Sequence, residues 1–221
     1  MLKINKIWLN DLAQGLKRVL KEPKVTLLQN EEEFMITART LLRVIDLIDH
    51  YTYFHSLRVA AYCEHMAREI NLSAVDRKVL HHGALLHDIG KIGIGKAILC
   101  KNGPLSNEEW LIVKRHPMLG TEMLEHAGPF PEILSIVRHH HENYDGSGYP
   151  YGLAGEEIPY LARILDIADS FDAMTSQRPY HPTRSVNQAM EELERCAAKQ
   201  FDPLLVPHFI RMIEKHGISV N

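Results

Sequence analysis

The stretch Ala84-Leu-Leu-His-Asp-Ile-Gly-Lys-Ile-Gly93 decides how this sequence is interpreted. It closes an apolar helical pattern over about 74–88, which places His87 on the apolar face and Asp88 beside it. Burying an imidazole or a carboxylate is costly unless the group is paired or coordinated. Neighbouring helical residues diverge by about 100°, so these two side chains can face different partners. The stretch therefore indicates a polar site inside a helical core.

Three further helical patterns repeat this feature. Each carries histidine or aspartate on its own apolar face, and the residues concerned are His55, His140 with His141 beside it, and Asp169 with Asp172. Metal coordination is the common explanation for several such side chains converging on one core. Imidazole and carboxylate ligands favour iron, manganese, zinc or a similar transition metal over magnesium alone. The adjacent pairs His87-Asp88 and His140-His141 favour two metal ions over one.

The whole sequence predicts an all-α fold, because its periodicity is helical nearly everywhere and no strand alternates. We expect helices at about 31–49, 53–70, 74–88, 107–125, 131–142, 158–175, 184–198 and 203–216, with capping boxes beginning at Ser73 and Ser106. His116-Pro117 interrupts one of them, either as a simple helix break or as a further ligand. The long irregular stretch 143–157 is either a functional loop or a plain connection.

Bulk composition limits the class of protein. The 221 residues suit one domain with a short appendage, so we expect a helical segment or connector at 1–30 and the main domain at 31–221. A formal net charge of -3 gives no reason to expect binding to a nucleic-acid polymer. The three cysteines lack any C-x-x-C spacing, and no apolar run has the length of a membrane span. We therefore expect a cytoplasmic protein without membrane insertion.

The ordered motifs resemble those of the HD-GYP subfamily, the bacterial cyclic di-GMP phosphodiesterases of the HD superfamily. The resemblance covers about residues 35–215. The matching stretches are His55-Ser-Leu-Arg-Val-Ala60, the Ala84–Gly93 stretch, His116-Pro117, His140-His-Glu-Asn-Tyr-Asp-Gly-Ser-Gly-Tyr-Pro150, Ala168-Asp-Ser-Phe-Asp-Ala-Met174, Arg178-Pro-Tyr180 and Phe201-Asp-Pro203. It implies an HD-type helical bundle with a metal site in its core.

The resemblance also implies a ligand set for two divalent transition metals, with iron or manganese first and zinc, nickel or cobalt as alternatives. Asp88 would bridge the two ions. One coordination sphere would be completed by His55, His87 and Asp169, and the other by His116, His140 and His141. The remaining histidines, including His81, His82 and His139, are expected to be surface or packing residues.

The implied reaction opens cyclic di-GMP to linear pGpG, with GMP as the product of a second cleavage. Two metal ions would activate water and neutralise charge on the scissile phosphate. Asp88 and Lys91 are the expected catalytic residues. Lys91 and Arg178 match family positions that hold phosphate, and His181 and Tyr149 are further candidates for substrate contacts. Tyr149 stacks on a base, contacts a partner protein or packs its own loop.

Three positions depart from the family pattern. Some members carry a glutamate one turn before the first ligand histidine and hold a third metal, whereas this chain has Tyr51 there. We therefore expect two metals. His181 replaces a basic residue, which points to weaker or pH-dependent substrate affinity, and Gly95 replaces a proline after the Ala84–Gly93 stretch.

Two other functions remain open at this level. One is a cyclic di-GMP receptor without turnover, and the other is an HD hydrolase of another cyclic dinucleotide such as cyclic GMP-AMP. The complete ligand set favours a hydrolase over the receptor. A diguanylate cyclase docking on the 143–157 loop and a homodimer are the partners that the resemblance leaves open.

Overall fold

The computed structural model describes residues 27–101, 103–128, 130–177 and 183–216, with the backbone alone over 27–33. These residues form helices and short 3-10 turns with two isolated β-bridges and no strand, which confirms the all-α prediction. The elements are α2 (Leu27–Ile48), α3 (His50–Glu69), α4 (Ala74–Leu86), η1 (Ile89–Gly93), α5 (Lys96–Leu99), α6 (Asn107–Val113), α7 (His116–Glu125), α8 (Pro131–His139), η2 (Gly155–Glu157), α9 (Tyr160–Thr175), α10 (Val186–Arg195) and α11 (Val206–His216).

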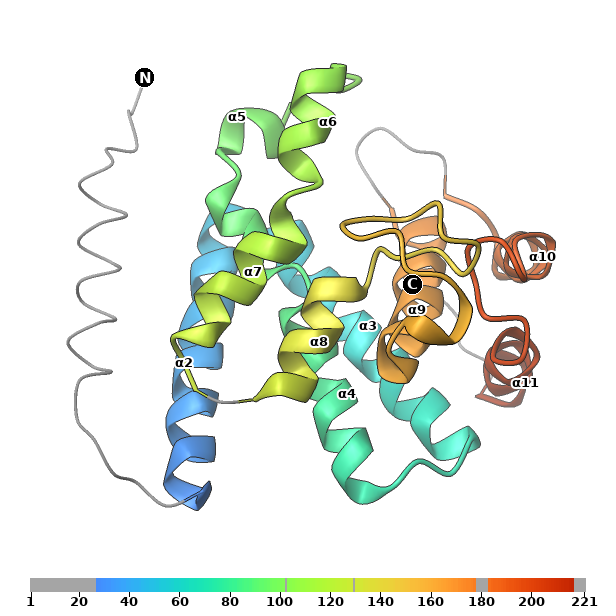
Figure 1. The fold of residues 1–221 in the computed structure, drawn as a ribbon. Coiled ribbons are helices and arrows are strands. Elements are labelled where there is room, and N and C mark those ends of the chain that lie inside the picture. Colours follow the sequence, from blue (N-terminus) through green and yellow to red (C-terminus); the bar gives the residue numbers. More distant parts are fainter. Residues whose placement is uncertain (1–26, 102, 129, 178–182, 217–221) are drawn as a thin grey trace.

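Two apolar clusters hold together the helices that Figure 1 shows as a ribbon. The larger one joins α3, α4 and α9 to α10 and α11, and the smaller one joins α2 to η1, α7 and α8. Helix α4 contributes to both, through Leu80 and Ala84 on one side and Leu86 on the other. His87 follows Leu86 directly, so the polar residues that interrupt the apolar pattern lie where the two clusters adjoin.

The helical pattern at 107–125 forms two helices, α6 and α7, instead of one. Helix α6 begins with the predicted capping box of Ser106 and Glu109 and ends at Val113. Pro117 has no N–H to donate to the Val113 carbonyl, so the α-helical ladder cannot continue through it. Pro117 is instead tolerated in the first turn of α7. The Val113 carbonyl accepts a bond from His116 Nδ1 at 2.8 Å.

The N-terminal boundary is not tested by the fold. Helix α2 begins at Leu27 and runs through the expected division between residues 30 and 31. Residues 1–26 lie outside the described part of the chain, so their role as a helical segment or connector stays a prediction. Among the helices that the structure describes, none combines the length and the apolar character of a membrane span.

The turn η1 lies against the start of α7 at Gly90. A Cβ added at Gly90 would lie 1.9 Å from the His116 carbonyl oxygen and 2.5 Å from the Gly120 nitrogen. Both are backbone atoms and cannot rotate away. Only glycine therefore allows the chain after Asp88 to approach the residue that begins α7.

We predict that Gly90→Ala lowers the free energy of unfolding by about 1–3 kcal/mol, the usual cost of overpacking. Gly95→Ala is the matched control, because a Cβ there meets nothing within 4 Å. It should change stability by no more than about 0.5 kcal/mol. Urea denaturation of the metal-free proteins measures both values. Equal stability of the two variants would show that the contact between η1 and α7 is not tight.

Candidate metal centre

Three histidines reach the centre through the same local bond. Nδ1 of His87 bonds the Ala84 carbonyl at 2.7 Å, and Nδ1 of His116 bonds the Val113 carbonyl at 2.8 Å. His140 makes the same bond to the carbonyl of Val137 at 2.8 Å. Each acceptor lies three residues earlier, at a helix end where carbonyls lack an intrahelical partner. A carbonyl oxygen only accepts, so Nδ1 must carry the proton in all three rings. The lone pair therefore lies on Nε2.

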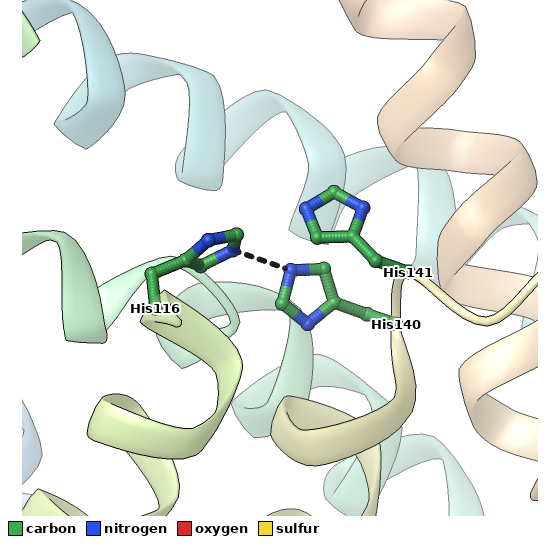
Figure 2. Close-up of side chains that lie close together, drawn as sticks. All are labelled: His116, His140 and His141. Carbon is green, nitrogen blue, oxygen red and sulfur yellow. Dashed lines mark hydrogen bonds between the residues drawn. The ribbon is translucent and has the colours of Figure 1, made fainter. Parts of the chain in front are cut away.

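These lone pairs face one another. Figure 2 shows His116, at the start of α7, and His140 and His141, directly after α8, with their rings gathered together. His116 Nε2 lies 3.1 Å from His140 Nε2, although neither nitrogen has a proton to donate when both Nδ1 atoms donate to carbonyls. Two such lone pairs repel each other in a buried site. A cation between the rings removes the repulsion.

A second group comes from α3, α4 and α9. His55 Nε2 lies 2.9 Å from Asp169 Oδ1, and His87 Nε2 lies 3.9 Å from the same oxygen. The ring of His55 is oriented from behind by Asp172, whose Oδ2 lies 2.7 Å from His55 Nδ1. Arg58 donates to both oxygens of Asp172, at 2.7 and 3.0 Å. These two bonds fix the carboxylate of Asp172, which in turn fixes the imidazole of His55.

Asp88 lies between the two groups and is 2% exposed. Its Oδ1 lies 3.3 Å from His116 Nε2, while its Oδ2 lies 3.4 Å from His87 Nε2 and 3.8 Å from His55 Nε2. The two carboxylate oxygens thus face different groups of histidines. Lys91 donates to Oδ2 at 2.6 Å from the turn that follows.

The donor set fits metal ions of the transition series. Three groups of side chains have ligand atoms close enough to hold an ion, namely His55 with His87 and Asp169, His116 with His140 and His141, and His87 with Asp88 and His140. His87 Nε2 is also buried without a hydrogen-bond partner within the described residues. An orphaned buried nitrogen pointing into such a group is explained by coordination.

The two groups of histidines differ in electrostatics. Burial lowers the pKa of His116 and of His141 to about 3, and it lowers the pKa of His140 as well. These rings are neutral and ready to bind metal, which requires the unprotonated imidazole. Burial would also lower the pKa of His55, but its hydrogen bonds to Asp169 and Asp172 outweigh burial and raise it to about 9. Without metal, His55 is therefore an imidazolium between carboxylates.

The other predicted site residues fall in different places. Tyr149 lies beside the centre, with its ring 4.8 Å from that of His141 and tilted by 33°. Tyr51 lies parallel to the ring of His55 at 6.1 Å. Arg178 and His181 lie outside the described residues, so their proposed contacts with substrate stay predictions. His81, His82 and His139 belong to none of the candidate metal groups of the described chain.

Sequence reasoning gave no role to several residues that hold the centre. Asp172 was on the predicted apolar face, but its bond to His55 depends on the packing of α9 against α3. Arg58 and Glu142 went unnoticed, although both lie inside the matching motifs. The place of Glu142 in the sequence, directly after His140-His141, is the signal that could have found it, and the structure shows that it is buried.

Comparison with known proteins fits this geometry. The model of the family described as "HD domain" matches residues 25–205. The chain belongs to the HD domain family. The match includes every candidate ligand, from His55 to Asp169, so the centre lies within the family's own domain and the resemblance to HD-GYP phosphodiesterases is confirmed.

Two curated relatives of this HD domain are bacterial phosphodiesterases. The chain is 39% identical over 161 residues to 3'3'-cGAMP-specific phosphodiesterase 3 of Vibrio cholerae serotype O1, covering 73% of the chain and 35% of the relative. It is 38% identical over 184 residues to a cyclic di-GMP phosphodiesterase of Thermotoga maritima, covering 82% and 50%. The chain thus spans between about a third and a half of the length of these relatives.

A solved structure shares the fold. The HDG"Y"P protein of Bdellovibrio bacteriovorus superposes with a TM-score of 0.62 at 17% identity, covering 90% of this chain and 68% of that one. At that identity the likeness concerns the fold alone, and it confirms the HD-type helical bundle.

The opposite pKa shifts predict a bell-shaped stability profile for the metal-free HD domain. The pKa of His55 is raised above its value in the unfolded chain. His55 therefore contributes stability that is present below about pH 6.5 and is lost as the pH rises through about 9. The lowered pKa values of His116, His140 and His141 contribute stability that is present above about pH 6.5 and lost on acidification. Stability should therefore peak near pH 6.5 and fall more steeply on the acid side.

Asp172→Asn tests the alkaline side of this profile. Removing the charge that faces His55 should lower the pKa of His55, as measured by NMR titration, and flatten the alkaline slope in urea denaturation with chelator. Asp202→Asn is the matched control, because Asp202 is equally buried but bonds Arg163 instead. A His55 pKa that stays the same in Asp172→Asn would contradict the assigned cause of the shift.

Proposed function

We propose that this HD domain is the catalytic part of a metal-dependent phosphodiesterase that hydrolyses cyclic di-GMP to pGpG, with GMP as a further product. The observation that carries the proposal is Asp88, whose two oxygens face two separate groups of buried imidazoles. The Nδ1 bonds of His87, His116 and His140 leave the Nε2 lone pairs of these rings facing inward, and imidazole nitrogens of this kind suit divalent transition metals. The names of the relatives support a cyclic dinucleotide as substrate.

We assign Asp88 to both ions, His55, His87 and Asp169 to one, and His116, His140 and His141 to the other. When bound, a metal pair lowers the pKa of water and neutralises charge on a phosphate. Asp88 and the histidines hold that pair in a buried setting. Lys91, one helical turn after Asp88 and 24% exposed, can turn its ammonium from Asp88 to a phosphate oxygen at the rim.

The overall reaction is a hydrolysis and needs no oxidant or cofactor beyond the metals. Water oxygen bonds to one phosphorus, the bond from that phosphorus to the leaving sugar oxygen breaks, and that oxygen receives a proton. Arg178 is proposed to grip the second phosphate and His181 to add a weaker contact. The proposal includes a cytoplasmic location, and it leaves docking of a diguanylate cyclase on 143–157 and a homodimer to direct measurement.

A product assay tests this function. Protein reconstituted separately with iron, manganese, zinc, nickel or cobalt is incubated with cyclic di-GMP, and the products are identified by mass spectrometry. We expect pGpG with iron or manganese. Binding of cyclic di-GMP without any linear product, in every metal form, would show a receptor and contradict the proposal.

The name of one relative gives a reason to test a second substrate. The relative at 39% identity is named for 3'3'-cGAMP. The same assay with 3'3'-cGAMP therefore measures the ratio of kcat/KM for the two dinucleotides. We expect cyclic di-GMP to be preferred, and a clear preference for 3'3'-cGAMP would move the substrate assignment without affecting the reaction class.

Asp88→Asn should reduce turnover to the background rate and lower metal content, because no other residue is assigned to both ions. The fold should persist, since apolar burial provides most of the stability. Asp76→Asn is the control, as Asp76 is an exposed residue at the start of α4, the helix that ends two residues before Asp88. Full activity in purified Asp88→Asn would contradict the two-metal mechanism.

Elemental analysis of the active protein should give two metals per chain. Tyr51 occupies the position from which a third ion would take a carboxylate ligand, and its side chain carries no carboxylate. Tyr51→Phe should keep both metals. Three ions per chain, or a metal lost in Tyr51→Phe, would contradict this count.

A further inference from the structure

His140 and His141 lie beyond the end of their helix. Helix α8 stops at His139, and His140 occupies the C-cap position. The α-helix therefore ends where the chain carries these two rings. Their rings must still meet that of His116, which comes from another helix (Figure 2). Ligands at a helix end need support from elsewhere in the chain, and the 143–157 loop provides it.

Glu142 ties that loop to the ligand pair. This side chain is 2% exposed. Its Oε1 accepts a hydrogen bond from the backbone N–H of Tyr151 at 2.7 Å, and its Oε2 accepts one from Leu153 at 3.1 Å. Hydrogen bonds to a carboxylate are charge-assisted and stronger than neutral ones. Glu142, the residue directly after His141, thus holds the loop at Tyr151 and Leu153.

Gly148 and Tyr149 bring the loop back onto the same peptide. The Tyr149 N–H donates to the His141 carbonyl at 3.0 Å. A Cβ at Gly148 would lie 2.2 Å from the Asn143 nitrogen and 2.5 Å from the His141 carbonyl oxygen, so glycine alone permits this approach. The backbone following His141 is therefore covered by the loop.

The ring of Tyr149 completes the contact. It lies 4.8 Å from the ring of His141 at a tilt of 33°, and the ammonium of Lys114 lies 5.3 Å from its centroid. Lys114 stands two residues before His116. The phenol ring thus contacts one candidate ligand and a residue beside another. A ring packed in this way restricts the rotation of the His141 imidazole.

We infer that Glu142, Gly148 and Tyr149 are positioning residues that hold His140 and His141 for the metal bound with His116. None of them is assigned to touch the metal, and none contacts the group of His55, His87 and Asp169 in any bond described above. The inference rests on the proposed metal-dependent function. It gives Tyr149 a role different from stacking on a substrate base.

This positioning role predicts that a change in the loop lowers the affinity for only one of the two metal ions. Disturbing Tyr149 should loosen the ion held by His116, His140 and His141 and leave the other ion in place. Loss of a supporting contact behind a metal ligand typically costs about 10- to 100-fold in metal affinity. A stacking role would instead raise KM and leave both affinities unchanged.

Cobalt titration of the metal-free full chain tests this without substrate. The visible absorption of bound Co²⁺ reports each ligand environment, and a competing chelator gives the two affinities. His116→Ala and His55→Ala provide reference spectra for loss of either ion. Tyr149→Ala should weaken one Co²⁺ by about 10- to 100-fold and give a spectrum like that of His116→Ala. Tyr149→Phe, which keeps the ring, should bind both ions as the natural chain does.

The loop itself supplies the matched control. The side chain of Tyr151 is 55% exposed and contacts Met118 and His139, neither of which is a candidate ligand. Only its backbone N–H bonds Glu142, so Tyr151→Ala should keep both Co²⁺ affinities. Glu142→Gln should weaken the same ion as Tyr149→Ala, because the amide nitrogen cannot accept one of the two backbone bonds. Equal weakening of both ions, or unchanged affinities in Tyr149→Ala, would overturn the inference.

Kinetics of the cobalt or manganese form separate this inference from the function itself. With saturating metal, Tyr149→Ala should recover most of its kcat at an unchanged KM. A raised KM with both metal affinities intact would show base stacking and overturn the positioning role. Failure of the natural chain to cleave any cyclic dinucleotide would contradict the proposed function, whereas the Co²⁺ affinities would still decide the role of Tyr149.

Discussion

The bond from a histidine Nδ1 to a backbone carbonyl three residues earlier is the constraint on which the centre depends. It recurs at His87, His116 and His140, each time at or just beyond the end of a helix. One bond satisfies a carbonyl that the helix leaves without a partner, fixes the tautomer and aims Nε2 inward. The position at which each helix ends therefore sets the direction of the ligand nitrogen.

Two different electrostatic solutions meet at Asp88. On one side, burial keeps His116, His140 and His141 neutral. On the other side, carboxylates from α9 surround His55, and Arg58 in turn compensates the charge of Asp172. Burial of charge is tolerated here because every carboxylate has a cation or several donors nearby. Asp88 joins the two sides with one oxygen toward each.

Much of the fold and the membership of the HD domain family followed from the sequence, because amphipathic helices and ordered motifs are local features. His55, His87, Asp88 and Asp169 were predicted as a group from their apolar faces, and the structure brings them together. Their assignment as ligands remains a proposal. The break at Val113 was visible only as a proline in a helical pattern. Its use as an acceptor for His116 depends on where the helix ends.

The supporting residues could not be predicted in the same way. Asp172 meets Arg58 across 114 residues of chain, and Gly90 is required by the backbone of α7. Such contacts arise from the packing of distant segments, for which a single sequence offers no periodic signal. Glu142 accepts a hydrogen bond from a loop whose path depends on Gly148. The role of each residue therefore becomes visible only once the loop is folded.

The origin of the ligands in separate elements has a consequence for chain entropy. His55 belongs to α3, His116 to α7 and Asp169 to α9, while His140 and His141 follow α8. Ions held by these side chains would act as cross-links that close large loops of the polypeptide. The free energy of metal binding would then become part of the free energy of folding, because no preformed site exists in the unfolded chain. Resistance to heat or protease would thus report the filling of this centre, and starvation for metal would shorten the lifetime of the protein.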